Sequence, residues 1–148
     1  MCFLRFPVTQ SGMFSSDITM TERSIPITHM VSTGNQADLG LEDFVGFFCE
    51  NPRVKAIGIH IEGIKDINKF QYSALKALKH NTPIVALKTG VSRLGRALTV
   101  SHTGSLAGED TLYDAFFSRV GIIRVKTPDE FLETLKFLCT TKLPAAGT

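Results

Sequence analysis

The sequence predicts an α/β domain in which one parallel sheet carries helices on both faces. Short apolar runs alternate along the chain with amphipathic stretches, which is the pattern of repeated strand–helix units. The run at residues 54–61 is almost wholly apolar and rich in β-branched residues, as expected of a central strand covered on both sides. The 148 residues, 43% hydrophobic and 20% charged, suit one soluble domain with its own core.

The predicted elements alternate from end to end. Strands are expected at residues 3–9, 27–32, 54–61, 84–87 and 122–125, and helices at 13–22, 41–49, 67–79, 106–117 and 128–138. Pro7 favours an edge position or a late start for the first strand. Asp38 is the expected cap of the second helix, whose apolar face ends in Cys49 as a core residue. Pro83 immediately precedes the fourth strand, and Pro128 fits the first turn of the last helix.

Five strands interleaved with helices predict a flavodoxin-like, doubly wound sheet. In such sheets ligands bind at the carboxyl ends of the strands. We therefore expect the polar turns that follow the strands to lie along one edge, at residues 10–12, 34–35, 62–63, 89–90 and 101–104.

Composition argues against several classes of function. The net charge of +2 and the lack of a basic cluster interleaved with aromatics give nucleic-acid binding little support. No apolar run approaches the roughly 20 residues of a membrane span, and residues 1–7 lack the features of a signal peptide. The cysteines Cys2, Cys49 and Cys139 are widely separated, so we expect reduced thiols in a cytoplasmic protein. Residues 1–141 are expected to form the domain and 142–148 a linker.

Known nucleotide and hydrolase motifs are missing or broken. The stretch 90–97 has the glycine spacing of a P-loop, but Arg96 and Ala97 replace the required Lys and Ser/Thr. A nucleotide P-loop is therefore rejected. Arg93 and Arg96 either contact phosphate or partner carboxylates or belong to a solvated basic loop. The sequence contains neither GxGxxG nor GxSxG.

Three further histidines do not point to a metal. His29, His60 and His80 have no ligand spacing to one another, so a zinc site is not expected. His60 lies two residues before Glu62 and shares its face of the strand. Packing is nevertheless the favoured interpretation of His60 over catalysis.

His102 is the principal candidate for chemistry. It lies in the polar turn Ser101-His102-Thr103-Gly104, after an apolar strand and just before a helix. A histidine that carries a phosphoryl group must be exposed at a loop with N–H donors nearby, and Thr103, Gly104 and the following helix N-terminus would supply them. The alternative is an ordinary turn histidine bonded to backbone.

Glu62 and the first turn are the next candidates. Glu62 ends the most apolar strand, and a carboxylate there would fix the tautomer of the His102 ring and leave its other nitrogen to attack. The alternative is a solvated glutamate at a strand end. The N–H groups and hydroxyl of Gln10-Ser11-Gly12 would hold an oxyanion, or Ser11 is an ordinary helix cap.

At this level of detail the chain resembles the NDP-forming acyl-CoA synthetases, relatives of the succinyl-CoA synthetase α subunit. The resemblance covers about residues 8–138, and the pairing of an EGIKD block with an SHTG-x-LAG block is specific. Its motifs are Gln10-Ser11-Gly12, Gly34-Asn35-Gln36-Ala37-Asp38, Glu62-Gly63-Ile64-Lys65-Asp66, Lys88-Thr89-Gly90 and Ser101-His102-Thr103-Gly104-Ser105-Leu106-Ala107-Gly108.

The resemblance implies a reversible reaction in which acyl-CoA, phosphate and ADP give acid, CoA and ATP. Carried over, His102 is the phosphoryl carrier and Glu62 orients it, while the helix N-terminus at Ser11, Gly12 and Met13 grips phosphate. Coenzyme A, ATP or ADP, and Mg are expected to bind mainly through a CoA-binding domain and an ATP-grasp domain. The other expected partner is a small carboxylic acid or its acyl phosphate, and the domain alone is expected to be inactive.

Two alternatives remain beside this expectation. Residues 13–25 are shorter and more polar than the family pattern, which fits a non-catalytic regulatory or docking module. Related protein acetyltransferases contain a similar domain but typically lack the histidine, so His102 favours the ligase.

Overall fold

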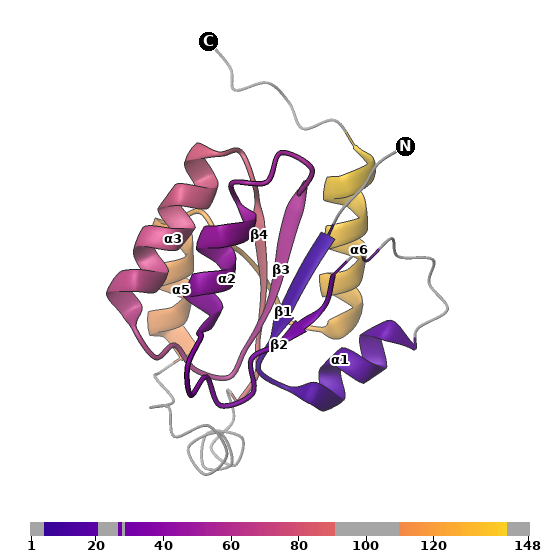
Figure 1. Ribbon diagram of the computed structural model, residues 1–148, viewed down its shortest axis with the longest axis horizontal. Helices are drawn as coiled ribbons and strands as arrows, with labels where there is room; N and C mark the ends of the chain where they lie inside the picture. Colours follow the sequence, from indigo (N-terminus) through magenta and orange to yellow (C-terminus); the bar gives the residue numbers. More distant parts are fainter. Residues whose placement is uncertain (1–4, 21–26, 28, 91–109, 142–148) are drawn as a thin grey trace.

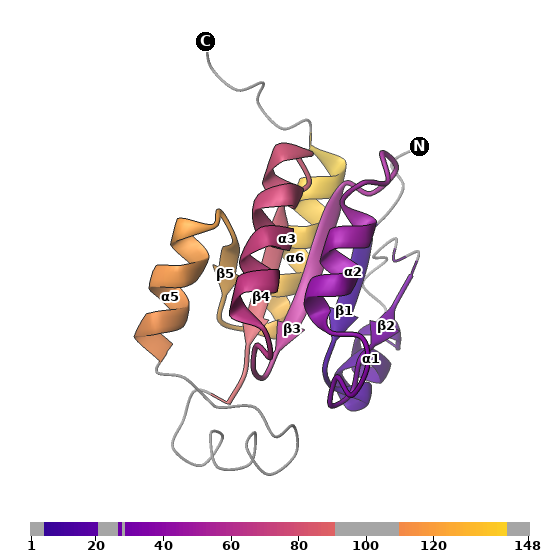
Figure 2. The same ribbon diagram turned by 60° about the vertical axis from the view of Figure 1, so that its left-hand side comes forward.

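Five strands form one parallel sheet in the order β2-β1-β3-β4-β5 (Figures 1 and 2). The computed structural model describes residues 5–20, 27, 29–90 and 110–141. The strands are β1 (Arg5–Thr9), β2 (Val31–Ser32), β3 (Ala56–Ile61), β4 (Ile84–Lys88) and β5 (Ile123–Val125). The chain winds outward in both directions from β1 and β3, so the predicted flavodoxin-like sheet is confirmed, with its topological switch point between these two strands.

Helices cover both faces of the sheet. They are α1 (Gly12–Thr19), α2 (Leu41–Phe48), α3 (Ile67–Lys79), α5 (Asp110–Arg119) and α6 (Pro128–Thr140). Figures 1 and 2 show α2, α3 and α5 on one face, with α1 and α6 on the other. Each face has its own apolar cluster, one around Ile57, Phe70 and Phe117 and the other around Phe131 and Leu135. Every residue of β3 is buried, as its predicted central position requires.

Pro7 does not place β1 at the edge of the sheet. The strand lies between β2 and β3, and Pro7 is in register with Gly58 of β3. The expectation of an edge strand is therefore wrong, although β2 pairs only with Val8 and Thr9. In the described pairings β2 is in register with Val8 and Thr9 and not with Pro7, so the missing N–H of Pro7 interrupts none of these pairings.

The cap of α2 also differs from the prediction. The helix begins at Leu41, as predicted, but its N-cap is Gly40 instead of Asp38. The backbone N–H of Gly40 donates to Asp43 Oδ2 at 3.0 Å, which is half of a capping box. The first helical N–H, that of Leu41, donates to Gln36 Oε1 at 3.0 Å. The predicted helix at 67–79 matches α3, whose N-cap Asp66 accepts from Lys69 N at 3.0 Å.

The other boundaries shift by a few residues. α1 ends at Thr19 instead of residue 22, and α6 continues to Thr140. The strands β2, β3 and β5 begin later than predicted, and β4 is one residue longer. The predicted strand residues 3–4 and helix residues 106–109 lie outside the described part of the chain. Cys49 is buried with a free thiol, as the core assignment predicted. The tail at 142–148 lies outside the described residues.

Candidate functional site

The turn after β1 presents backbone donors at the carboxyl edge of the sheet. Ser11 is the N-cap of α1, and its Oγ accepts from Phe14 N at 3.3 Å, so the capping interpretation is confirmed. The N–H of Ser11 donates to Thr9 Oγ1 at 2.9 Å. The first turn of a helix has no intrahelical acceptors for its N–H groups, which leaves those of Gly12 and Met13 pointing outward. The space where a Cβ would stand at Gly12 is open within 4 Å.

Gln10 ties this turn to the one that follows β3. Its side chain is buried, and its Oε1 accepts from the N–H groups of both Glu62 and Gly63, the latter at 3.0 Å. Its Nε2 donates to Gly63 O at 2.7 Å. The Gln10 amide therefore bonds to two N–H groups and one carbonyl of the Glu62–Gly63 backbone. Because Gln10 directly precedes the N-cap of α1, these bonds place Glu62 beside the N-terminus of that helix. Sequence reasoning included Gln10 only as part of the turn.

The loop after β2 joins the same cluster through a second glutamine. Gln36, 1% exposed and with a φ of 56°, places Nε2 3.5 Å from Gly63 O. Its Oε1 accepts from Leu41 N at 3.0 Å, and its carbonyl accepts from Lys65 Nζ at 3.0 Å. The polar turns after β1, β2 and β3 therefore meet at one edge, as the fold predicted.

Glu62 itself stands at the boundary between sheet and solvent. Its side chain is half-buried, and its backbone N–H is held by Gln10. Its carboxylate makes no hydrogen bond or ion pair to any side chain in the described ranges 5–20, 29–90 and 110–141. The acidic group is thus positioned by its backbone and remains available to a partner at this edge.

The end of β4 completes the arrangement. Thr89 N donates to Ile61 O at 3.0 Å, which aligns the end of β4 with the end of β3. Lys88 is buried, donates from Nζ to Thr89 O and lies 4.9 Å from the centre of the Tyr113 ring. Cation–π contact of this kind offsets part of the cost of burying an ammonium group.

His60 occupies the sheet edge between these turns. Its Nδ1 lies 3.1 Å from Thr9 Oγ1, and its Nε2 lies 3.1 Å from Thr89 Oγ1. Its ring stacks on Phe14 with centroids 4.3 Å apart and planes 23° apart. Burial, with a smaller effect from the Lys88 charge, lowers the pKa of His60 to about 4, so the ring is neutral near pH 7. Sequence reasoning treated His60 as packing and missed its two hydroxyl partners.

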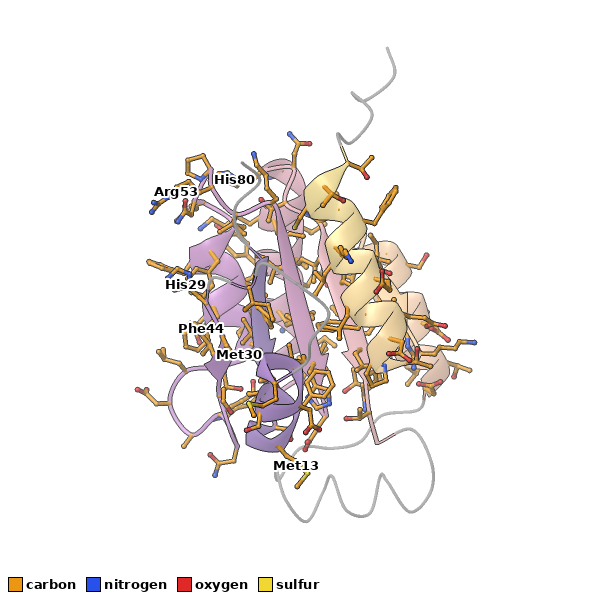
Figure 3. The ribbon with its side chains drawn as sticks, turned by 90° about the vertical axis from the view of Figure 1, so that its right-hand side faces the viewer. Met13, His29, Met30, Phe44, Arg53 and His80 are labelled. Atoms are coloured by element: carbon orange, nitrogen blue, oxygen red, sulfur yellow. The ribbon has the colours of Figure 1, made fainter. Side chains whose placement is uncertain are left out.

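Several predicted site residues lie outside the described part of the chain. His102, Thr103 and Gly104 belong to it, as do Arg93 and Arg96 of the P-loop-like stretch. The structure therefore brings together Ser11, Gly12, Met13 and Glu62, and it leaves their pairing with His102 as a prediction. Met13, at 78% exposed, is open to solvent at the same end of the molecule (Figure 3).

In the described ranges, no group of three or more His, Cys, Asp or Glu side chains could hold a metal ion. Over the same ranges, no helix combines the length and the apolar character that crossing a bilayer requires.

In flavodoxin-like sheets ligands bind at the carboxyl ends of the strands, and in this chain the N-terminus of α1 and the Glu62 side chain lie together at that edge. The chain belongs to the family of succinyl-CoA ligase-like flavodoxin domains, whose model matches residues 7–138. The resemblance read from the motifs is therefore confirmed.

Two similar proteins are ADP-forming acetate–CoA ligases. The chain is 38% identical over 117 residues to the ADP-forming acetate–CoA ligase of Methanocaldococcus jannaschii, a match that covers 79% of this chain and 16% of the relative. It is 38% identical over 127 residues to the α subunit of the ADP-forming acetate–CoA ligase II of Pyrococcus furiosus, covering 84% of this chain and 28% of that subunit.

A solved structure agrees with the fold. The dinucleotide-forming acetyl-coenzyme A synthetase 1 of Ca. Korarchaeum cryptofilum, in complex with phosphate and ADP, superposes with a TM-score of 0.87 and 29% identity. The superposition covers 99% of this chain and 32% of that one. This chain thus spans less than a third of the length of each of these three proteins.

Proposed function

We propose that this chain is the phosphohistidine-bearing ligase domain of an ADP-forming acyl-CoA synthetase. The reaction converts acyl-CoA, phosphate and ADP into a carboxylic acid, CoA and ATP, and it is reversible. Phosphate first displaces CoA to give an acyl phosphate. The phosphoryl group then moves to a nitrogen of His102, releasing the carboxylate, and finally to the terminal phosphate oxygen of ADP.

The observation that carries the proposal is the junction made by Gln10. Its amide holds the Glu62–Gly63 backbone against the turn that starts α1. An acidic side chain and two outward N–H donors, those of Gly12 and Met13, are thereby fixed at the same edge. This pair of features is what a phosphorylated imidazole needs, since the anion binds to backbone N–H groups and the cationic ring binds to a carboxylate.

Each group would have a separate role. The N–H groups of Gly12 and Met13 and the hydroxyl of Ser11 would bind the phosphoryl oxygens, while the backbone of Thr103 and Gly104 would add donors beside the ring. The Glu62 carboxylate would accept from one ring nitrogen of His102, so that the other nitrogen carries the lone pair that attacks phosphorus. Groups aligned in advance in this way stabilise the transition state without reorganising.

Coenzyme A, nucleotide and Mg²⁺ are assigned to other parts of the enzyme. The described residues gather no set of carboxylates suited to a metal, so no step is assigned to the ion on this chain. We place these groups on a CoA-binding domain and an ATP-grasp domain, on the same or another polypeptide. The buried cysteines Cys49 and Cys139, which form no disulfide, fit a cytoplasmic setting.

The test is transfer of labelled phosphate to the chain. The chain is incubated with CoA-binding and ATP-grasp domains of an ADP-forming relative, Mg²⁺ and ATP labelled at the γ position. An acid-labile, base-stable phosphate should form on the wild type and on His80→Ala, because His80 is exposed at the opposite end of the molecule (Figure 3). It should be absent from His102→Ala. Label that persists in His102→Ala contradicts the phosphohistidine, and a wild type that takes no label while the added domains are active favours the docking module.

A further inference from the structure

His60 connects two strand ends through its ring nitrogens. Thr9 is the last residue of β1, and Thr89 directly follows β4, so β3 carries the histidine between them. Both nitrogens lie 3.1 Å from a threonine hydroxyl oxygen. With His60 4% and Thr9 1% exposed, solvent does not replace these partners. Buried polar groups with partners on both sides are expensive to change, because loss of one partner leaves the other unsatisfied.

The hydrogen bonds of Thr9 select one tautomer of the ring. The hydroxyl oxygen of Thr9 accepts from Ser11 N–H at 2.9 Å and lies 3.0 Å from Ser11 O. If the single hydroxyl proton is donated to Ser11 O, His60 Nδ1 must carry its own proton and donate to Thr9. Nε2 is then the acceptor, and Thr89 donates to it. In a neutral imidazole this arrangement uses every one of these contacts, with the ring proton on Nδ1.

The same histidine also supports α1. Phe14 stacks on the ring, and the backbone N–H of Phe14 is capped by the Ser11 hydroxyl. The turn that presents Gly12 and Met13 is therefore fixed on both sides. Thr9 precedes it and bonds to Ser11, and Phe14 follows it and stacks on His60. Both of these residues lie against His60.

We propose that His60 is a positioning residue that couples the Ser11–Gly12 turn to the start of the segment after β4. The inference rests on the proposed function, because that function makes the turn the phosphate-binding element and the segment after β4 the one that leads to His102. His60 touches neither phosphate nor acyl group in this account. It holds the two elements at a fixed separation, as a neutral group that brings no charge into the site.

Three substitutions separate the two hydrogen bonds from the packing. His60→Asn places an amide near the position of Nδ1 and retains the bond to Thr9. His60→Gln reaches the position of Nε2 and retains the bond to Thr89. His60→Phe keeps the stacking on Phe14 and loses both bonds, which makes it the matched control for packing.

The decisive measurement is a coupling cycle on the 148-residue chain, read by backbone amide NMR. Thr89→Val should shift the amide signals of Ser11 and Gly12 in the wild-type background. It should leave them in place when His60 is already Phe, because the connection has been removed. The ring ¹⁵N shifts of His60 in the wild type should show a neutral ring protonated at Nδ1. If Thr89→Val fails to move the Ser11 and Gly12 signals, or moves them equally in both backgrounds, His60 is only a packed core residue and the proposal is overturned.

Binding of inorganic phosphate measures whether the positioning by His60 matters for the proposed phosphate site. Titration of the wild type should shift the Gly12 and Met13 amides, and His60→Phe should bind roughly three- to tenfold more weakly, the range expected for losing one or two ordinary hydrogen bonds. His60→Asn should rescue part of the affinity, since it keeps the contact to the turn itself. Phosphate that binds equally to wild type and His60→Phe overturns the positioning role. Phosphate that does not bind the wild type contradicts the proposed function instead, and the coupling cycle still decides the role of His60.

Discussion

Gln10 and Gly63 are joined by two hydrogen bonds that run in opposite directions. Gln10 Nε2 donates to Gly63 O at 2.7 Å, and Gly63 N donates to Gln10 Oε1 at 3.0 Å. The Gln10 side-chain amide thus donates to and accepts from the Gly63 backbone, as the backbone of a neighbouring strand does. It does so beyond the ends of β1 and β3. Because the Glu62 N–H shares the same oxygen, the position of the acidic residue depends on an amide 52 residues earlier in the sequence.

The first prediction is that Gln10→Ala destabilises the chain by about 3 kcal/mol. The substitution leaves the N–H groups of Glu62 and Gly63 and the carbonyl of Gly63 with lost partners, and each buried unsatisfied group costs about 1–3 kcal/mol. Gln36 retains only its 3.5 Å contact with Gly63 O. Urea unfolding followed by circular dichroism measures the change.

Gln10→Glu tests the hydrogen bond to Gly63 O separately from the two bonds to the N–H groups. It has the shape of glutamine and keeps an acceptor for the two N–H groups, but it replaces the donor to Gly63 O with a second oxygen. Repulsion between that oxygen and the carbonyl should destabilise the chain at pH 7 and recover as the pH falls and the carboxyl group becomes protonated. Stability of Gln10→Glu equal to the wild type at pH 7 would show that the donor to Gly63 O contributes nothing.

The second prediction concerns the charge of Glu62. Glu62→Gln preserves the backbone bond to Gln10 and the size of the side chain, so the fold should be unaffected within about 0.5 kcal/mol. Phosphoryl transfer to His102 should slow on the order of 10²-fold, the lower end of what a positioned acid–base group contributes. Rapid-quench measurement of label uptake, with the CoA-binding and ATP-grasp domains supplied, reads the rate.

Glu50→Gln is the matched control for this charge change. Glu50 is exposed, follows α2 and pairs with Lys76 of α3 at 2.9 Å, away from the carboxyl edge of the sheet. Its substitution should leave the rate of label uptake unchanged. A rate for Glu62→Gln that matches that of Glu50→Gln would remove the orienting role from Glu62.

The fold could be predicted from the sequence because the patterns that mark helices and strands lie within short stretches of the chain. The 67–79 helix was predicted with both ends correct from the helical spacing of its apolar residues, and in the structure Asp66 caps it. Asp38 is not the cap of α2 because it lies two residues before the N-cap Gly40, and Gln36 Oε1 accepts from the first helical N–H, that of Leu41. The edge position predicted from Pro7 was wrong because β2 pairs only with Val8 and Thr9, so an interior strand can hold a proline. The length of β2 could not be inferred from the residues of β1.

The part of the site that follows from the strand topology was predictable from the sequence. A parallel sheet puts all strand ends at one edge, so the meeting of Glu62 with the Ser11–Gly12 turn followed from the order of elements. The partners of Gln10 and His60 did not follow, because they depend on contacts between residues 29 to 53 positions apart in sequence. A glutamine and a threonine at the end of an apolar strand were the available signal, since polar groups at such a buried position need partners.

The third prediction is a loss of stability in weak acid that depends on His60. Burial, and secondarily the charge of Lys88, lowers its pKa from 6.5 to about 4 in the folded chain. The native state therefore favours the neutral ring, and this contribution is fully present above pH 6.5 and lost as the pH falls from 6.5 to about 4. The total loss is about 3 kcal/mol, at 1.36 kcal/mol for each pH unit of the shift.

His60→Phe should abolish this pH dependence between pH 7 and 5. Chemical denaturation at half-unit intervals over this range measures it. Asp43, whose pKa is lowered chiefly by its hydrogen bond with Lys69, contributes stability that is lost only as the pH falls below its ordinary value of 3.8. The two effects therefore occupy separate pH ranges. An equal slope in wild type and His60→Phe would assign the loss to another group.

The fourth prediction tests how closely α6 packs on β3. A Cβ at Gly58 would lie 2.6 Å from Phe131 Cζ and 2.7 Å from Leu135 Cδ1, and both side chains are fully buried. Contacts this short to buried side chains must be relieved by a shift of Phe131, Leu135 or α6, so Gly58→Ala should cost about 1–3 kcal/mol. The midpoint of urea unfolding should fall accordingly, with the slope of the transition unchanged.

Two companion variants make this prediction specific. Gly12→Ala adds the same methyl group where nothing lies within 4 Å, so the stability should change by less than about 0.5 kcal/mol. Leu135→Ala in the Gly58→Ala background removes one of the two obstructing groups, so the double variant should be more stable than the sum of the single changes predicts. Strict additivity would show that the two residues are not in contact. In that case Gly58, which lies on the same face of β3 as His60, would not set the distance between this strand and α6.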